Sequence, residues 1–104
     1  MNATSFRRPP GAPPYVFGHR GVRGAAPENT MAAFELAAES GADGVELDVR
    51  LCRTGELVVC HDPTLARFTG GKDERKIADL DLGELARTDV GRGAPVPPLA
   101  EVLD

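Results

Sequence analysis

Five side chains that are able to handle a phosphate ester lie within the first 62 residues of the chain. His19 and Arg20 stand side by side between two glycines. Glu46 and Asp48 are two positions apart, and His61 follows a short apolar run. Imidazoles exchange protons near neutral pH, a guanidinium grips phosphate through its planar fork, and paired carboxylates hold hard cations. Together these residue types indicate a metal-assisted attack on a phosphate ester.

The two carboxylates belong to a segment in which apolar and polar residues alternate. Residues 45, 47, 49 and 51 are apolar, whereas residues 46, 48 and 50 are polar. This alternation predicts a strand over 43–51 and places Glu46 and Asp48 on one face. If the odd-numbered face packs against helices, the carboxylates on the even-numbered face need a cation or a base as partner. Oxygen ligands suit Mg²⁺ or Ca²⁺, and the choice between these ions stays open.

A second apolar run, 57–60, follows after only five residues, which are too few for the crossover between parallel strands. Pairing of the two runs therefore predicts an antiparallel hairpin that turns at Thr54-Gly55. In this register His61 faces Asp48, on the same surface as Glu46. The register also sends Cys52 and Cys60 to opposite faces, which argues against a disulfide and against a zinc site.

The elements around these residues have an α/β order. Residues 15–18 form an apolar run with aromatic and β-branched character, which predicts a buried strand. A glycine-rich loop then leads to a predicted helix over 31–40, with Asn29 or Thr30 as its N-cap. Further along the chain, Asp81 stands three residues before a glutamate, a spacing that predicts a short capped helix.

Length and composition describe one small globular domain. The chain has 104 residues, 41% of them hydrophobic and 27% charged, and its net charge of −4 disfavours nucleic-acid binding. The chain has no apolar run long enough to predict a membrane span, and Met1–Pro14 lacks the apolar core of a secretory signal. We therefore expect residence in the cytoplasm. Residues 1–14 are rich in proline and are expected to be a disordered leader, with a polyproline interaction module as the less favoured alternative.

Several short motifs resemble the glycerophosphodiester phosphodiesterases in their order and spacing. These motifs are His19-Arg20-Gly21, Pro27-Glu28-Asn29-Thr30, Glu46-Leu47-Asp48-Val49, His61-Asp62 with Leu65, Arg67-Phe68-Thr69-Gly70, and Val96 to Leu103. The resemblance implies that residues 15–104 are the N-terminal portion of a (β/α)8 TIM barrel of the phosphatidylinositol-phospholipase-C-like group. The barrel is incomplete in this chain, because such a domain needs about 250 residues.

The resemblance also implies roles for the five side chains. Glu46 and Asp48 would hold a divalent cation, either Mg²⁺ or Ca²⁺, and Arg20 would bind the phosphate. His19 and His61 would be the acid/base pair, with the assignment between them open. The implied substrates are glycerophosphodiesters, hydrolysed to glycerol 3-phosphate and an alcohol. The alternative is a non-catalytic fragment that keeps metal or phosphate affinity or requires a complementing chain, because a third acidic ligand and a lysine of the family have no counterpart here.

Overall fold

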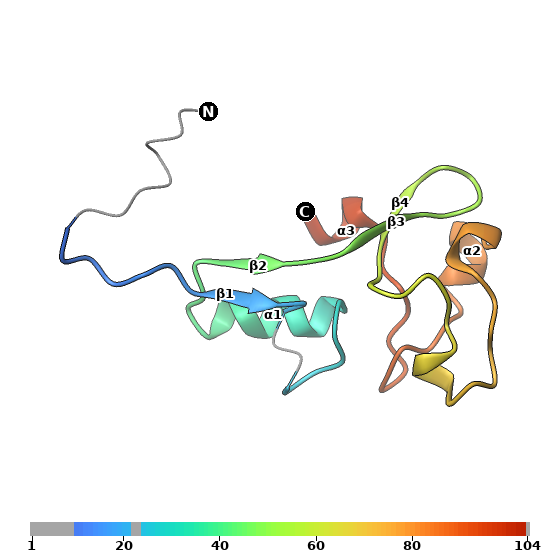
Figure 1. Ribbon diagram of the computed structural model, residues 1–104, viewed down its shortest axis with the longest axis horizontal. Helices are drawn as coiled ribbons and strands as arrows, with labels where there is room; N and C mark the ends of the chain where they lie inside the picture. Colours follow the sequence, from blue (N-terminus) through green and yellow to red (C-terminus); the bar gives the residue numbers. More distant parts are fainter. Residues whose placement is uncertain (1–9, 22–23, 104) are drawn as a thin grey trace.

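The computed structural model of the protein describes residues 10–21 and 24–103. In chain order its elements are β1 (Phe17–His19), α1 (Met31–Glu39), β2 (Gly44–Glu46), β3 (Val49–Leu51), β4 (Leu57–Val59), η2 (Arg67–Thr69), η3 (Ile77–Asp79), α2 (Leu82–Leu85) and α3 (Leu99–Leu103). Figure 1 shows β1 and β2 lying along α1, with the chain continuing from β2 into the β3–β4 hairpin. Residues 1–9 of the predicted leader lie outside the described residues, and residues 10–14 form no helix or strand.

The first helix begins where the sequence predicts. Thr30 is the N-cap of α1, and its Oγ1 accepts a hydrogen bond from the backbone nitrogen of Ala33 at 3.3 Å. The same hydroxyl donates to the carbonyl oxygen of Pro27 at 2.6 Å. After the helix, Gly41 adopts φ +80, the left-handed conformation that ends many helices. α1 buries one face, made of Ala33, Phe34 and Ala37.

α1 connects two parallel strands, so β1, α1 and β2 form a βαβ unit. Phe17 lies opposite Gly44, and His19 lies opposite Glu46. The prediction that the first strand is buried is wrong, because Val16 and Phe17 are each 61% exposed. Among the described residues β1 pairs with β2 alone, so its other edge stays open to solvent.

The single strand predicted over 43–51 is interrupted in its middle. β2 pairs with β1 and β3 pairs with β4, so the two halves belong to different sheets. Leu47 and Asp48 form the junction between them. Asp48 therefore lies where the two small sheets meet.

β3 and β4 form the predicted antiparallel hairpin, but the predicted register is wrong by one residue. Val49 lies opposite Val59, and the backbone nitrogen of Cys60 donates to the carbonyl oxygen of Asp48 at 2.9 Å. Asp48 therefore faces Cys60, and His61 lies one position further along. The physical reason is the loop, which has three residues, 53–55, between a paired Cys52 and Glu56 instead of two. Its last residue is Gly55, whose φ of +86 suits a three-residue hairpin loop with a bulge.

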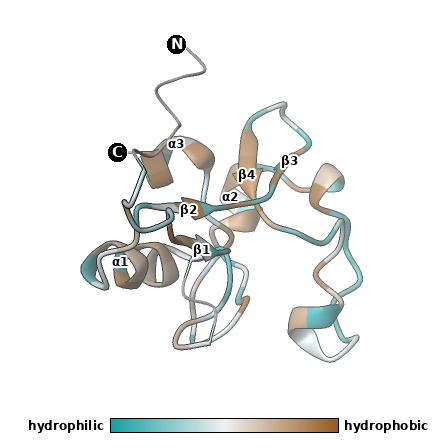
Figure 2. Ribbon diagram, turned by 60° about the vertical axis from the view of Figure 1, so that its left-hand side comes forward, coloured by the Kyte–Doolittle hydropathy of each residue, from teal (hydrophilic) through white to brown (hydrophobic). Residues whose placement is uncertain are grey.

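The main core lies on the even-numbered face of this hairpin. It is formed by the buried residues Cys52, Val58, Cys60, Leu65, Ile77, Leu80, Leu85, Val90 and Val96. In Figure 2 the ribbon of α2, largely brown for hydrophobic residues, lies next to the brown ribbon of β4. Packing of the odd-numbered face against helices is a condition considered in the sequence analysis, and β3 does not meet it because Val49 and Leu51 are 46% and 59% exposed. The segment that follows β4 packs on the even-numbered face instead, and therefore this face is the buried one.

Both cysteines are buried and free. A disulfide between them is disfavoured in the sequence analysis, but the reason given there is wrong. The prediction places Cys52 and Cys60 on opposite faces of the hairpin. The shifted register puts both on the even-numbered face, and both contribute to the same core cluster. The short helix predicted from Asp81 is present as α2, with a complete capping box between Asp81 and Glu84.

Candidate active site

A tight turn at the end of β1 presents His19 and Arg20. Gly21 has φ +80, and a Cβ atom at this position would lie 2.6 Å from the backbone carbon of Ala33 in α1. Only glycine fits such a close approach between a turn and a helix. Arg20 itself has a positive φ of 55, and its backbone nitrogen donates to the carbonyl oxygen of Glu46 at 2.8 Å. The turn is therefore fixed to α1 on one side and to the end of β2 on the other.

The parallel register of β1 and β2 brings His19 and Glu46 together. These residues lie opposite each other at the carboxyl ends of the two strands. Nε2 of His19 is 3.3 Å from Oε2 of Glu46, and the two side chains are 49% and 50% exposed. The pair is therefore accessible to a ligand, as a proton-transfer group next to a carboxylate needs to be.

Arg20 and Asp48 form the second close pair of predicted site residues. Nε of Arg20 is 3.2 Å from Oδ2 of Asp48, and Nδ2 of Asn29 donates to the same oxygen at 3.1 Å. The Arg20 side chain is only 13% exposed. Its Nη1 donates to Oε2 of Glu28 at 2.9 Å, so two carboxylates flank the guanidinium. Four of the five predicted side chains thus gather at the ends of β1 and β2.

The contacts of His61 differ from the predicted ones. The register shift separates it from Asp48, and its Nδ1 instead lies 2.7 Å from Oδ1 of the neighbouring Asp62. Arg50 holds the backbone at this point, because its Nε and Nη2 donate to the carbonyl oxygen of His61 at 2.9 and 2.5 Å. The His61 side chain is 48% exposed. The prediction that His61 faces Asp48 is wrong, although the imidazole still lies just past the end of β4.

Three further charged residues, which the sequence analysis does not single out for a role, link His61 to Arg20. Nε of Arg67 donates to Oδ2 of Asp62 at 2.8 Å, and Nη2 of Arg67 contacts Oε1 of Glu28. Glu28 and Asp62 stand in the quoted motifs, but the 39 positions between Glu28 and Arg67 hide their contact from a local reading of the sequence.

These contacts favour the ionised form of the carboxylates of Asp62 and Glu28. Hydrogen bonds from Arg67 and then from His61 lower the pKa of Asp62 to about 2. Burial opposes ionisation of Glu28, but hydrogen bonds from Arg67 and Arg20 outweigh it and lower the pKa of this carboxyl as well. Charges of opposite sign therefore alternate along a continuous chain of side chains, Asp62, Arg67, Glu28, Arg20 and Asp48, and His61 contacts the Asp62 end of this chain.

The carboxylates of Glu46 and Asp48 suit a hard divalent cation in their donor chemistry. Asn29 donates to Asp48 through Nδ2, and its Oδ1 is buried and lacks a hydrogen-bond partner among the described residues. Across residues 10–21 and 24–103 no group of three His, Cys, Asp or Glu side chains is close enough to hold a metal. The residues present therefore fit such an ion in kind and supply part of a coordination sphere.

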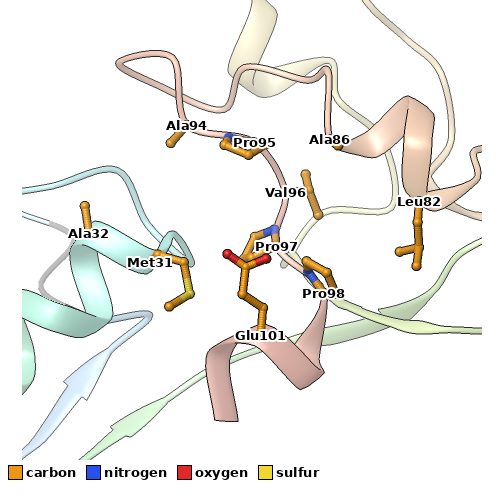
Figure 3. Close-up of a pocket in the computed structure, with 10 residues that line it drawn as sticks. All are labelled: Met31, Ala32, Leu82, Ala86, Ala94, Pro95, Val96, Pro97, Pro98 and Glu101. Carbon is orange, nitrogen blue, oxygen red and sulfur yellow. The ribbon is translucent and has the colours of Figure 1, made fainter. Parts of the chain in front are cut away.

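A pocket of about 330 Å³ lies elsewhere, between α1, α2 and the loop over 94–98. Figure 3 shows the carboxylate of Glu101 at its centre, beside Met31 and Pro97. The other lining residues are mostly apolar, and none of the five predicted site residues is among them. The site is therefore the set of strand ends and not this pocket. None of the described helices is long and apolar enough to cross a membrane.

Comparisons with known proteins agree with this geometry. Residues 19–104 match the model of the glycerophosphoryl diester phosphodiesterase family. A glycerophosphodiester phosphodiesterase of Caldanaerobacter subterraneus subsp. tengcongensis is 45% identical over 96 residues, which cover 86% of this chain and 39% of the relative. The chain therefore spans about two fifths of the length of such relatives.

Two solved structures give the same result. The glycerophosphodiester phosphodiesterase of Agrobacterium tumefaciens is 38% identical, with a TM-score of 0.77 over 86% of this chain and 41% of that one. A phosphodiesterase of Oleispira antarctica, solved with its product sn-glycerol 3-phosphate, is also 38% identical, with a TM-score of 0.77 over 86% of this chain and 38% of that one. The fold is the N-terminal portion of the (β/α)8 barrel of these proteins. The chain belongs to the glycerophosphoryl diester phosphodiesterase family.

Proposed function

We propose that this chain carries the acid/base, phosphate-binding and metal-binding side chains of an enzyme that hydrolyses glycerophosphodiesters to glycerol 3-phosphate and an alcohol. The observation that supports this most is the gathering of His19, Arg20, Glu46 and Asp48 at the carboxyl ends of β1 and β2. In barrels of this class, active sites are built at the carboxyl ends of the strands.

The two histidines divide the proton transfers. One imidazole accepts the proton of the attacking hydroxyl, and the other donates a proton to the oxygen of the leaving alcohol. Both His19 and His61 have half-exposed rings with a carboxylate partner. The nucleophile is either water or the 2-hydroxyl of the glycerol moiety. In the second case the alcohol leaves first, and water then opens the cyclic phosphate to give glycerol 3-phosphate.

Arg20 binds the phosphate. Its Nη1 donates to Glu28, and its Nε forms an ion pair with Asp48 but makes no hydrogen bond to a described residue. Its second terminal nitrogen, Nη2, also has no hydrogen bond to a described residue. A guanidinium held in this way donates to a phosphoryl oxygen without losing further side-chain freedom. Negative charge that develops on the phosphoryl oxygens is thereby stabilised.

Glu46 and Asp48 would hold the divalent cation, either Mg²⁺ or Ca²⁺, together with oxygens that these two residues do not supply. When bound, the cation would neutralise charge on the phosphoryl oxygens. Asn29 positions Asp48 through the hydrogen bond from its Nδ2 to Oδ2. Residence in the cytoplasm stays a prediction from the sequence.

The test is hydrolysis of glycerophosphocholine by the 104-residue chain in the presence of Mg²⁺ or Ca²⁺. His19→Ala and His61→Ala are each expected to lower kcat by about 10²- to 10⁴-fold, the usual contribution of a general acid or base. Chelation of the metal should abolish turnover, and restoring one of the two ions should recover it. A wild-type rate in either variant would remove that histidine from the mechanism.

A second candidate is a chain that binds metal or phosphate without turnover, or that needs a complementing chain for activity. It is favoured by the lack, among the described residues, of a third acidic ligand beside Glu46 and Asp48. Titration calorimetry with glycerol 3-phosphate and each ion separates the two candidates. Binding that depends on Arg20, with no turnover by the chain alone, would favour the second.

A further inference from the structure

We propose that Arg67 is a positioning residue, which holds His61 and Arg20 in one fixed arrangement through the carboxylates of Asp62 and Glu28. The roles of His61 and Arg20 rest on the proposed function, whereas the contacts themselves do not. The arrangement would couple the proton-transfer group to the phosphate-binding group, although the two lie on separate loops.

The guanidinium of Arg67 contacts both carboxylates at once. Its Nε and Nη2 lie 2.8 and 3.2 Å from the two oxygens of Asp62, which is a two-point pair. The same Nη2 also contacts Oε1 of Glu28. The face of the guanidinium lies over the ring of Phe68, with Cζ 4.6 Å from the ring centroid. Planar, forked geometry of this kind belongs to arginine, and a lysine offers only a point charge.

The ion pair between Arg67 and Asp62 determines which ring nitrogen of His61 is available for proton transfer. Asp62 is ionised at neutral pH, and hydrogen bonds from Arg67 and His61 stabilise this form further by lowering its pKa to about 2. An ionised carboxylate only accepts hydrogen bonds, so Nδ1 of His61, 2.7 Å away, carries the proton. Nε2 is then the nitrogen that exchanges a proton with substrate. Fixing Asp62 through Arg67 thus fixes both the ring orientation and the tautomer.

Arg67 also supports Arg20, through the carboxylate of Glu28 that both arginines contact. Glu28 is 10% exposed and accepts from Arg20 through Oε2 and from Arg67 through Oε1. Each oxygen of this carboxylate therefore has its own arginine. Removal of Arg67 would leave Glu28 with one partner and Asp62 with only the neighbouring imidazole, and both would regain freedom to rotate.

Arg75 provides a matched control. It forms the same kind of two-point pair, with Nε and Nη2 at 3.0 and 2.8 Å from the oxygens of Asp73. Its side chain is 53% exposed, against 49% for Arg67. Neither Arg75 nor Asp73 contacts a candidate site residue. Arg67→Met and Arg75→Met thus remove equal charge and similar packing at the site and away from it.

The first measurement is the tautomer of His61 in the full chain, read from long-range ¹H–¹⁵N spectra with labelled histidine. The chain has only two histidines, so a His19→Gln spectrum assigns the signals. We expect the Nδ1-protonated form in the wild type and in Arg75→Met, and a shift toward the mixture of a free imidazole in Arg67→Met. Arg67→Lys keeps the charge and should give an intermediate population. Asp62→Ala, which removes the acceptor, confirms that the spectrum responds.

The second measurement is the split between kcat and KM for glycerophosphocholine. Arg67→Met is expected to lower kcat by about 10- to 100-fold, the effect of a small misplacement of a catalytic group. Arg75→Met should keep the wild-type kcat. An unchanged His61 tautomer in Arg67→Met, or a changed tautomer with wild-type kcat, overturns the proposal. A wild-type chain without turnover contradicts the proposed function instead, and the tautomer alone then decides whether Arg67 positions His61.

Discussion

Gly21 leaves no room for a Cβ atom between its turn and α1. Replacing it by alanine should therefore destabilise the chain in two separable ways. The backbone has φ +80, a conformation that costs an L-residue about 1–2 kcal/mol. In addition, the new Cβ would lie 2.6 Å from both the backbone carbon and the Cβ of Ala33, so α1 has to move. Overpacking of this kind costs about 1–3 kcal/mol. The sum is about 2–5 kcal/mol, a large part of the stability of a chain of this size.

Gly41 provides the control for this prediction. It has the same φ of +80, but a Cβ there would meet nothing within 4 Å. Gly41→Ala should therefore cost only the backbone part, about 1–2 kcal/mol. The free energies of unfolding are measured by urea denaturation, followed by circular dichroism. If the two alanine variants lose equal stability, the contact between the turn and α1 does not limit the residue at position 21, and the packing argument fails.

Two further predictions concern the charged chain and the core. The lowered pKa of Asp62, about 2 against an ordinary 3.8, means that its ion pair stabilises the fold at neutral pH and loses this effect as the pH falls through 2. Allowing for its partial exposure, we expect the free energy of unfolding of the wild type to exceed that of Asp62→Asn by about 1 kcal/mol at neutral pH. Chemical denaturation across the acid range should show this difference shrinking, and a constant difference would contradict the assignment. In the core, Leu65→Ala should cost about 2–5 kcal/mol because Leu65 is 2% exposed. Leu51→Ala, at 59% exposure, should stay within about 0.5 kcal/mol by the same measurement.

Local rules predicted the elements of this fold well. The N-cap at Thr30, the capping box at Asp81 and the antiparallel pairing of β3 with β4 all depend on residues that are close in sequence. The predicted order of strand, loop, helix and strand is also that of the βαβ unit, whose parallel register brings His19 opposite Glu46. For these features the sequence spacing and the physical contact involve the same short stretch of chain.

The errors come from features that local spacing does not determine. Thr54-Gly55 is compatible with a two-residue turn, and only the pairing of Cys52 with Glu56 shows a three-residue loop. That single residue shifts the pairing by one position, which puts Cys52 and Cys60 on the same face and separates His61 from Asp48. The contact between Glu28 and Arg67 depends on how two distant loops fold over the strand ends, so no periodic pattern in the sequence carries it.

The burial of both cysteines on one face of the hairpin has a practical consequence for following the folding of this chain. Burial raises the pKa of the Cys60 thiol to about 11, so the thiol is protonated and its nucleophilicity is low while the core is closed. Cys52 is 4% exposed and belongs to the same cluster. A thiol reagent reacts with such groups only after the hairpin separates from the segment that covers it. The rate of modification by the reagent therefore measures how often this core opens, and no engineered label is needed.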